Sequence, residues 1–156
     1  MFWSLVHRIR VTLISAVVGG VAGGAAMAMA MTASQASNPL LFLVTGTFVA
    51  FIFGTFGASL GGVMGLIPTM LLGALLSLLR KIPPFHHWAA WMLSGVATGA
   101  LIAMMTNHLA GNDSPQAAPT PALAQTYWFA AWIVGGASAM LAYWKVETNW
   151  ARRPHA

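Results

Sequence analysis

Cysteine is absent from the 156 residues, and acidic residues are almost absent. The lack of cysteine excludes disulfides, thiolate catalysis and metal sites built on sulfur. The only acids are Asp113 and Glu147, against seven lysines and arginines. Charged residues make up 6% of the chain, whereas ordinary soluble domains carry about 25%. A soluble surface of the usual composition cannot be built from so little charge.

Hydrophobic residues instead make up 58% of the chain, and the mean hydropathy is +0.75. These values indicate one small polytopic membrane domain over residues 1–156. The seven cations are too few for the charge density of a nucleic-acid binder, so no nucleic-acid partner is expected. Their number fits orientation signals beside a membrane.

Three apolar segments have the length of about 20 residues that crosses a hydrocarbon core of ~30 Å. They are residues 11–32, 88–107 and 124–143. The first follows Arg8 and Arg10 and so resembles a signal peptide, but its apolar run is longer than the usual run of about 7–15 residues. It is therefore expected to be a retained span.

The uncharged segment 40–79 is ambiguous. As one helix it would be about 60 Å long at ~1.5 Å per residue, roughly twice the bilayer core. One solution is a single crossing by a long or broken second helix, interrupted near Pro68. The other is a hairpin near Gly61 and Gly62, which would give five spans. The single crossing is favoured because it places all seven cations on one side.

The expected fold is thus an all-α membrane bundle of four transmembrane helices, with five as the alternative. Residues 111–125 are expected to form an external loop, because they are rich in proline and almost uncharged. Aromatic residues gather toward both faces, as interfacial belts do. The residues expected to anchor the chain at the interface or in lipid are Arg80, Lys81, Trp88, Trp91, Trp128 and Trp144.

Small residues, mostly glycines, recur at four-residue spacing in every expected span, so each row lies on one helix face. In lipid, glycine lets two helix backbones approach closely, and dispersion replaces the missing hydrophobic drive. The rows indicate helix packing within the chain, docking of a partner protein, or a substrate path lined by bare backbone. The glycines expected to carry packing or docking are Gly19, Gly20, Gly23, Gly24, Gly57, Gly61, Gly65, Gly95, Gly99, Gly135 and Gly136.

Few side chains are suited to chemistry. His86 and His87 are neighbours that point in different directions, and no pair of histidines faces one another within the spans, as a bis-histidine haem requires. A metal site from His7, His86 and His87 is the alternative to plain interfacial histidines. Neither acid lies within a span, which argues against an ion-coupled carrier. No catalytic or nucleotide-binding motif is present, so neither an enzyme nor a cofactor is expected.

The most polar run between two apolar stretches is residues 77–88, with the sequence SLLRKIPPFHHW. Arg80 and Lys81 end the apolar segment on the cytoplasmic side, and Pro83 and Pro84 turn the chain. The run is expected to be a loop that seats two helices; the alternative is a docking surface for a partner or for anionic lipid.

The expected function is a non-catalytic accessory or structural subunit of a larger integral membrane complex, because packing features abound and catalytic features are lacking. The alternative is a small homo-oligomeric pore, channel or holin-like permeability protein. The expected partners are membrane lipids and other integral membrane proteins or copies of the chain. The abundance of alanine and glycine and the short loops favour the cytoplasmic membrane of a bacterium, with both termini in the cytoplasm.

Overall fold

The computed structural model describes residues 2–33, 38–83, 85–112 and 122–151. Within these residues every regular element is an α-helix, which confirms the all-α fold. The helices are α1 (Phe2–Ala33), α2 (Pro39–Met64), α3 (Leu66–Leu79), α4 (Trp88–Asn112) and α5 (Ala122–Ala151). Helix therefore extends into both ends of the expected loop 111–125, and the middle of that loop lies outside the described residues.

Four of these helices contain segments long and apolar enough to cross a membrane, as the sequence predicts. The segments are Val6–Ala33, Pro39–Ser59, Trp88–His108 and Gln125–Trp150. The last one continues beyond the predicted end at residue 143. α3 is apolar too, but its 14 residues span only about 21 Å at ~1.5 Å per residue, so it is too short to cross alone.

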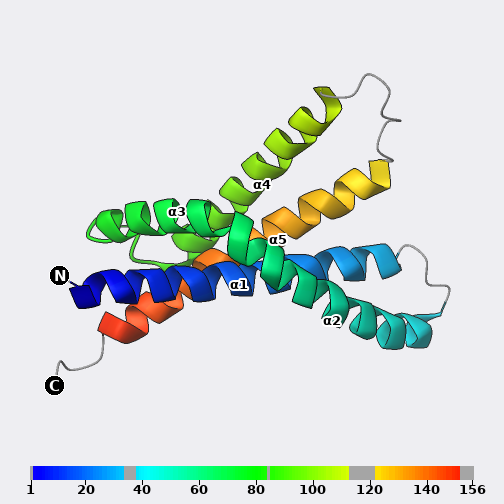
Figure 1. The fold of residues 1–156 in the computed structure, drawn as a ribbon, viewed down its shortest axis with the longest axis horizontal. Coiled ribbons are helices and arrows are strands. Elements are labelled where there is room, and N and C mark those ends of the chain that lie inside the picture. Colours follow the sequence, from blue (N-terminus) through cyan, green and yellow to red (C-terminus); the bar gives the residue numbers. More distant parts are fainter. Residues whose placement is uncertain (1, 34–37, 84, 113–121, 152–156) are drawn as a thin grey trace.

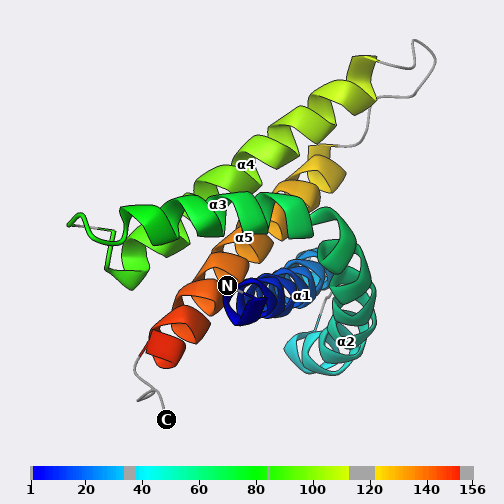
Figure 2. The ribbon, with the colours of Figure 1, turned by 60° about the vertical axis from the view of Figure 1, so that its left-hand side comes forward.

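The long apolar segment 40–79 is a broken helix. α2 remains helical through Gly61 and Gly62, so the alternative of a hairpin at these two glycines is wrong. The break falls at Gly65, between the last residue of α2 and the first of α3. Pro68 lies in the first turn of α3, where its missing N–H leaves no helical hydrogen bond unmade. α3 then leads away from α2 rather than back along it (Figures 1 and 2).

The four long helices form a row in the order α2, α1, α5, α4. α1 packs extensively against α2 and α5, and α5 packs against α1 and α4, whereas α3 makes few contacts with any helix. The row consists of two helix pairs, α1 with α2 and α4 with α5. The two pairs diverge from one another toward the end of the molecule where α1 ends and α2 begins (Figure 1). α3 lies across the other half of the row (Figure 2).

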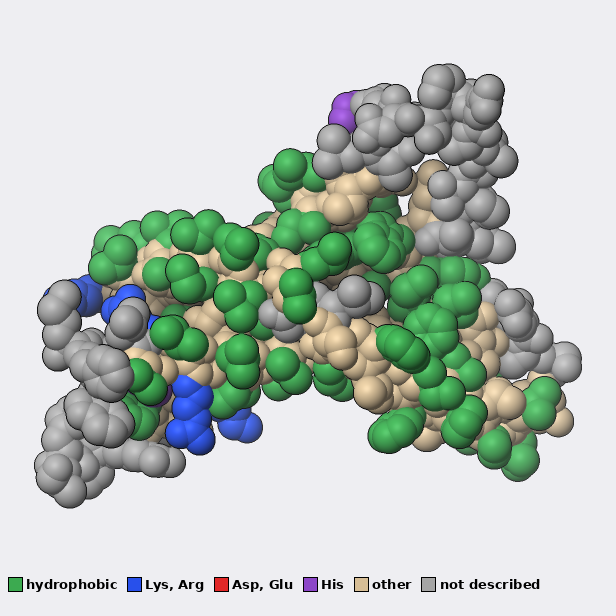
Figure 3. Space-filling model, viewed as in Figure 1, with side chains coloured by type: hydrophobic (Ala, Val, Ile, Leu, Met, Phe, Trp, Pro, Cys, Tyr) green, Lys and Arg blue, Asp and Glu red, His purple; other side chains and the backbone are tan. Residues whose placement is uncertain are grey.

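Lysine and arginine gather at one end of the molecule. The start of α1, the end of α3, the start of α4 and the end of α5 all meet there (Figure 1). The basic side chains visible in Figure 3 lie at that end, while the diverging helix pairs expose hydrophobic side chains. This cationic end carries Arg8, Arg10, Arg80, Lys81 and Lys145; Arg152 and Arg153 lie outside the described residues.

Labelling of single cysteines tests the four-span topology, and the chain has no cysteine of its own to interfere. We expect Asn38→Cys and His108→Cys to react with an impermeant maleimide from the same side of the membrane, because both lie at the end opposite the cations. Lys81→Cys should react only after the membrane is opened, as the positive-inside rule requires. Labelling of positions 38 and 108 from opposite sides would establish five crossings instead.

Candidate functional site

Adjacent glycines on α1 face two different helices. Gly19 and Gly23 face α5: a Cβ atom at Gly19 would lie 2.6 Å from the carbonyl oxygen of Gly135, and one at Gly23 would lie 2.5 Å from that of Ala131. Gly24 faces α2 instead, where a Cβ would meet the carbonyl of Phe53. Successive residues point about 100° apart on a helix, so two interleaved rows serve two neighbours.

The neighbouring helices return these contacts. On α2, a Cβ at Gly57 would meet the carbonyl of Gly20, and on α5 one at Gly135 would lie 2.9 Å from the carbonyl oxygen of Gly19. Any side chain at these positions would therefore push against backbone, which cannot rotate away as a side chain can.

Like α1, α5 has adjacent glycines that face two different helices, and one of its rows packs against α4. Gly95 and Gly136 oppose one another, each against the other's carbonyl, and Gly99 lies against the carbonyl of Trp132. Gly135 and Gly136 thus face opposite neighbours, α1 and α4.

Two of the expected glycines stand apart from these contacts. Gly65 marks the break between α2 and α3, and the surroundings of Gly61 lie outside the described residues. Gly73 belongs to the close approaches although the expected set does not include it, because a Cβ there would meet the ring of Tyr143. Gly73 lies two four-residue steps after Gly65, and this spacing is the signal that could have identified it.

A matched pair of alanine substitutions tests the glycine contacts. Gly95→Ala places a methyl group against the backbone of Gly136 and should destabilise the fold by about 1–3 kcal/mol. At Gly46 a Cβ meets only the Phe42 and Thr32 side chains, at 3.6 Å or more, so Gly46→Ala should leave stability unchanged or raise it by up to ~1 kcal/mol. Unfolding in detergent micelles, followed by circular dichroism, measures both; equal effects would contradict the assignment.

An apolar groove opens where the helix pairs diverge. Its volume is about 460 Å³, within the range of about 300–1,000 Å³ typical of ligand pockets. All five helices line it. Its lining includes Ala16 and Met27 of α1, Leu72 of α3, Thr98 and Ile102 of α4, and Trp128, Trp132 and Met140 of α5. We call this space the glycine groove, because most of the expected glycines also line it.

The glycine groove is closed at one end by the hydrophobic core. Leu72 and Met140, which line the groove, also pack with the buried Leu76, Trp91 and Tyr143. At the other end, Trp128 and Trp132 meet edge to face with ring centres 5.8 Å apart. The Trp128 indole N–H donates to the Thr106 hydroxyl at 3.0 Å. The groove therefore runs from the core to an aromatic pair whose position is set by a hydrogen bond.

Hydroxyl side chains in the helices bond largely to their own backbone. Each of a series of serines and threonines donates to the carbonyl four residues earlier, which satisfies the hydroxyl hydrogen without a partner helix. The series is Thr12, Ser15, Thr32, Thr45, Thr47, Thr55, Ser59, Ser77, Ser94, Thr106 and Thr148. The hydroxyl protons of this series are therefore already engaged.

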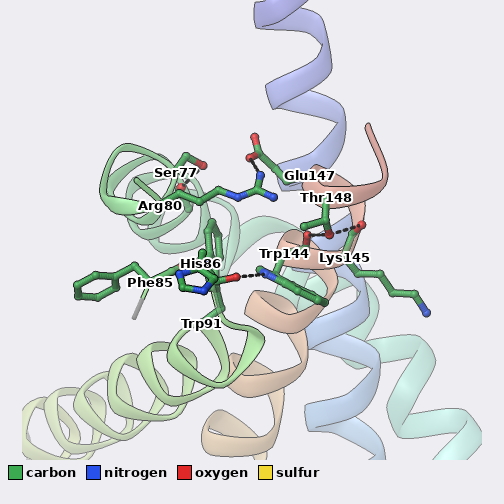
Figure 4. A network of polar contacts seen from close by, with 10 residues as sticks. Ser77, Arg80, Phe85, His86, Trp91, Trp144, Lys145, Glu147 and Thr148 are labelled. Carbon is green, nitrogen blue, oxygen red and sulfur yellow. Dashed lines mark hydrogen bonds and ion pairs between the residues drawn. The ribbon is translucent and has the colours of Figure 1, made fainter. Parts of the chain in front are cut away.

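A polar cluster joins the run 77–88 to α5 at the cationic end (Figure 4). Arg80 pairs with Glu147 at 3.6 Å. The Trp144 indole donates to the carbonyl of His86 at 3.4 Å, and the Trp91 indole to the carbonyl of Phe85 at 2.8 Å. These contacts hold the run against α4 and α5; that it serves only to seat two helices stays a prediction.

The expected anchors lie in different environments. Trp88 is 44% exposed and Trp128 39% exposed, so both can reach the interface. Lys81 is exposed, and Arg80 and Trp144 are partly buried in the polar cluster. Trp91 is 0% exposed and stacks on Tyr143 at 5.7 Å, so it belongs to the core and does not anchor the chain in lipid. Helix rotation, which turns Trp91 inward, explains the difference.

The histidines of the run do not form a cluster with other metal-binding groups. Among the residues that the structure describes, no group of three histidine, cysteine or acidic side chains is placed to hold a metal ion. His86 and His87 are exposed, with ring centres 6.1 Å apart, and His7 stacks instead on Trp150 at 4.0 Å.

Substitutions in the run separate side-chain from backbone roles. The double variant His86→Ala/His87→Ala should change stability by less than about 0.5 kcal/mol, since the Trp144 indole bonds only to the backbone of His86. Trp91→Phe should cost about 1–3 kcal/mol, because it leaves the Phe85 carbonyl without its donor inside the core. Detergent unfolding measures both. A larger loss in the histidine variant, or loss of bound metal, would overturn the structural role.

Comparison with known proteins adds no relative: no family model matches the chain, and no curated protein or solved structure matches it significantly. What can be inferred about function therefore rests on the geometry of the described residues.

Proposed function

We propose that the chain is a non-catalytic structural subunit of an integral membrane complex, and that it meets its partner through the outer face of α2. The partner is another integral membrane protein or a second copy of the chain. The main support is that the two faces of α2 differ: one packs closely against α1, whereas the opposite face is exposed.

The packed face of α2 contains Gly54 and Gly57. Gly57 lies against the Gly20 carbonyl, and Gly54 approaches Val21. The opposite face contains Leu41, Val44, Phe48, Phe51 and Thr55, spaced alternately by three and four residues, and all five are exposed. We call these five residues the α2 outer stripe. Phe48 is 66% and Phe51 75% exposed, so two large rings stand free on this stripe.

The α2 outer stripe combines features of helix interfaces. A spacing of three and four residues brings side chains to one seam, as in helix pairs that interlock. Thr55 and the neighbouring Ser59 add exposed hydroxyls on the same side, and such groups are enriched where membrane helices meet. These features support contact with a protein helix on this face of α2.

The proposed location is the cytoplasmic membrane of a bacterium, with the cationic end and both termini in the cytoplasm. Support comes from the gathering of basic side chains at one end of the fold, since lysine and arginine mark the cytoplasmic side of membrane proteins.

The second candidate function is a small homo-oligomeric pore, and exposed hydroxyls favour it. Thr45, Thr47, Thr55 and Ser59 are all exposed on α2. Copies arranged with α2 toward a common axis would place these hydroxyls beside water. Their protons are engaged by the helix backbone, so the oxygens would face such a pore as acceptors.

A pair of double variants tests the α2 outer stripe. Phe48→Ala/Phe51→Ala removes both exposed rings, whereas Leu93→Ala/Leu101→Ala trims exposed residues of α4 as a control. In mild detergent, native gels with mass spectrometry should show the wild type and the control in a complex, and the α2 variant as a single chain. Because lipid solvates the trimmed surface in either state, neither variant should lose its fold.

Two outcomes would contradict this proposal: a wild-type chain that migrates alone after mild extraction, or an α2 variant that keeps its complex. Ion flux through liposomes that contain only the purified wild type would assign the pore instead, and we expect no flux.

A further inference from the structure

The glycine groove has a length and a closed end that define what it can hold. We propose that it binds one acyl chain of a phospholipid from the bilayer leaflet remote from the cationic end. This site is separate from the α2 outer stripe, which lies on the opposite side of α2 from the packed face.

The length of the groove matches one leaflet. Along α1 its lining extends from Ala16 to Met27, which is about 16 Å of helix at ~1.5 Å per residue. Along α5 it extends from Trp128 to Met140, about 18 Å on the same scale. Half of a hydrocarbon core of ~30 Å is about 15 Å. A lipid chain that enters at the outer surface therefore ends where the groove ends.

The closed end argues against a protein helix as the occupant. A helix that crosses the membrane needs the whole core of ~30 Å. The groove stops at Leu72 and Met140, and Met140 is buried in the core with Trp91 and Tyr143. A spanning helix placed in the groove would meet this core halfway, whereas an acyl chain terminates there.

The lining fits hydrocarbon and does not fit water or ions. Glycine, alanine and large apolar residues dominate it, and among the described lining residues only Thr69 and Thr98 carry a hydroxyl. An ordered water needs two to four polar partners, which this lining does not offer. The cavity exists because the glycine contacts hold the helix backbones together while the pairs diverge beyond them (Figure 1).

The mouth of the groove matches the depth of a lipid headgroup. Trp128 and Trp132 lie near the start of the α5 span, which begins at Gln125. Indole rings favour this level of the bilayer because one part is apolar and the N–H is polar. The Trp128 N–H is already bonded to Thr106, so the ring is held beside the entering chain.

Photolabelling in a defined bilayer tests the proposal. The protein is reconstituted into vesicles of phosphatidylethanolamine and phosphatidylglycerol with a trace of phospholipid that carries a diazirine in one acyl chain. After illumination, mass spectrometry should find cross-links concentrated on groove residues such as Thr98 and Ile102. Because unlabelled phospholipid competes for the groove, labelling should rise in proportion to the share of the probe among the lipids.

Three variants sharpen the assignment. Ile102→Trp and Met27→Trp fill the groove from α4 and from α1, and each should lower groove labelling about tenfold. Leu101→Trp adds the same ring to the exposed side of α4 and should leave labelling unchanged. Circular dichroism checks the fold of each variant. Because the two filling substitutions lie on different helices, the test still stands if one of these variants fails to fold.

Three results would overturn the inference. Equal labelling of the groove and of the outward side of α4 would show that the lipid contact is not selective. Labelling unaffected by both filling variants would place the acyl chain elsewhere. A cross-link between Thr98→Cys and a second protein chain would assign the groove to a protein occupant and would also overturn it.

Discussion

The bare backbone of α1 touches both of its neighbours, and the rest of the fold depends on this contact. Lipid solvates leucine as well as a protein core does, so burial of apolar surface gives these helices little reason to associate. Close backbone approach supplies dispersion and weak Cα–H···O contacts instead. Because Gly19 and Gly23 face α5 while Gly24 faces α2, one helix joins the two helix pairs into a row through close backbone contact.

The two ends of the row are held in different ways. At the cationic end, large side chains and polar bonds fill the space: Trp91 stacks on Tyr143, and Arg80 pairs with Glu147. At the other end the pairs separate and leave the glycine groove. Glycine contacts fix the helix crossings in the middle of the row, so the divergence on one side and the dense packing on the other have the same origin.

Length and composition explain what the sequence predicts well. Four spans, the broken second helix and the one-sided cations all follow from apolar runs and from seven basic residues. The sequence places the break near Pro68; α2 ends at Met64, and Pro68 itself lies in the first turn of α3, where a proline is tolerated. The prediction that Trp91 anchors the chain in lipid is wrong, because this side chain is buried. Every face of α4 is apolar, so hydropathy does not indicate which face of the helix turns inward. The groove was not predictable either, because it arises from how the helix pairs diverge.

The order of the helices in the row has a consequence for biosynthesis. α1 is made before both of its neighbours: α2 follows it directly in the chain, whereas α5 follows only after α3 and α4. The pair of α1 and α2 can form while the ribosome is still at work, as early segments generally do. The surface around Gly19 and Gly23 then stays uncovered in the bilayer until α5 is made. A nascent chain that stalls before α5 would leave this surface open to the wrong helix.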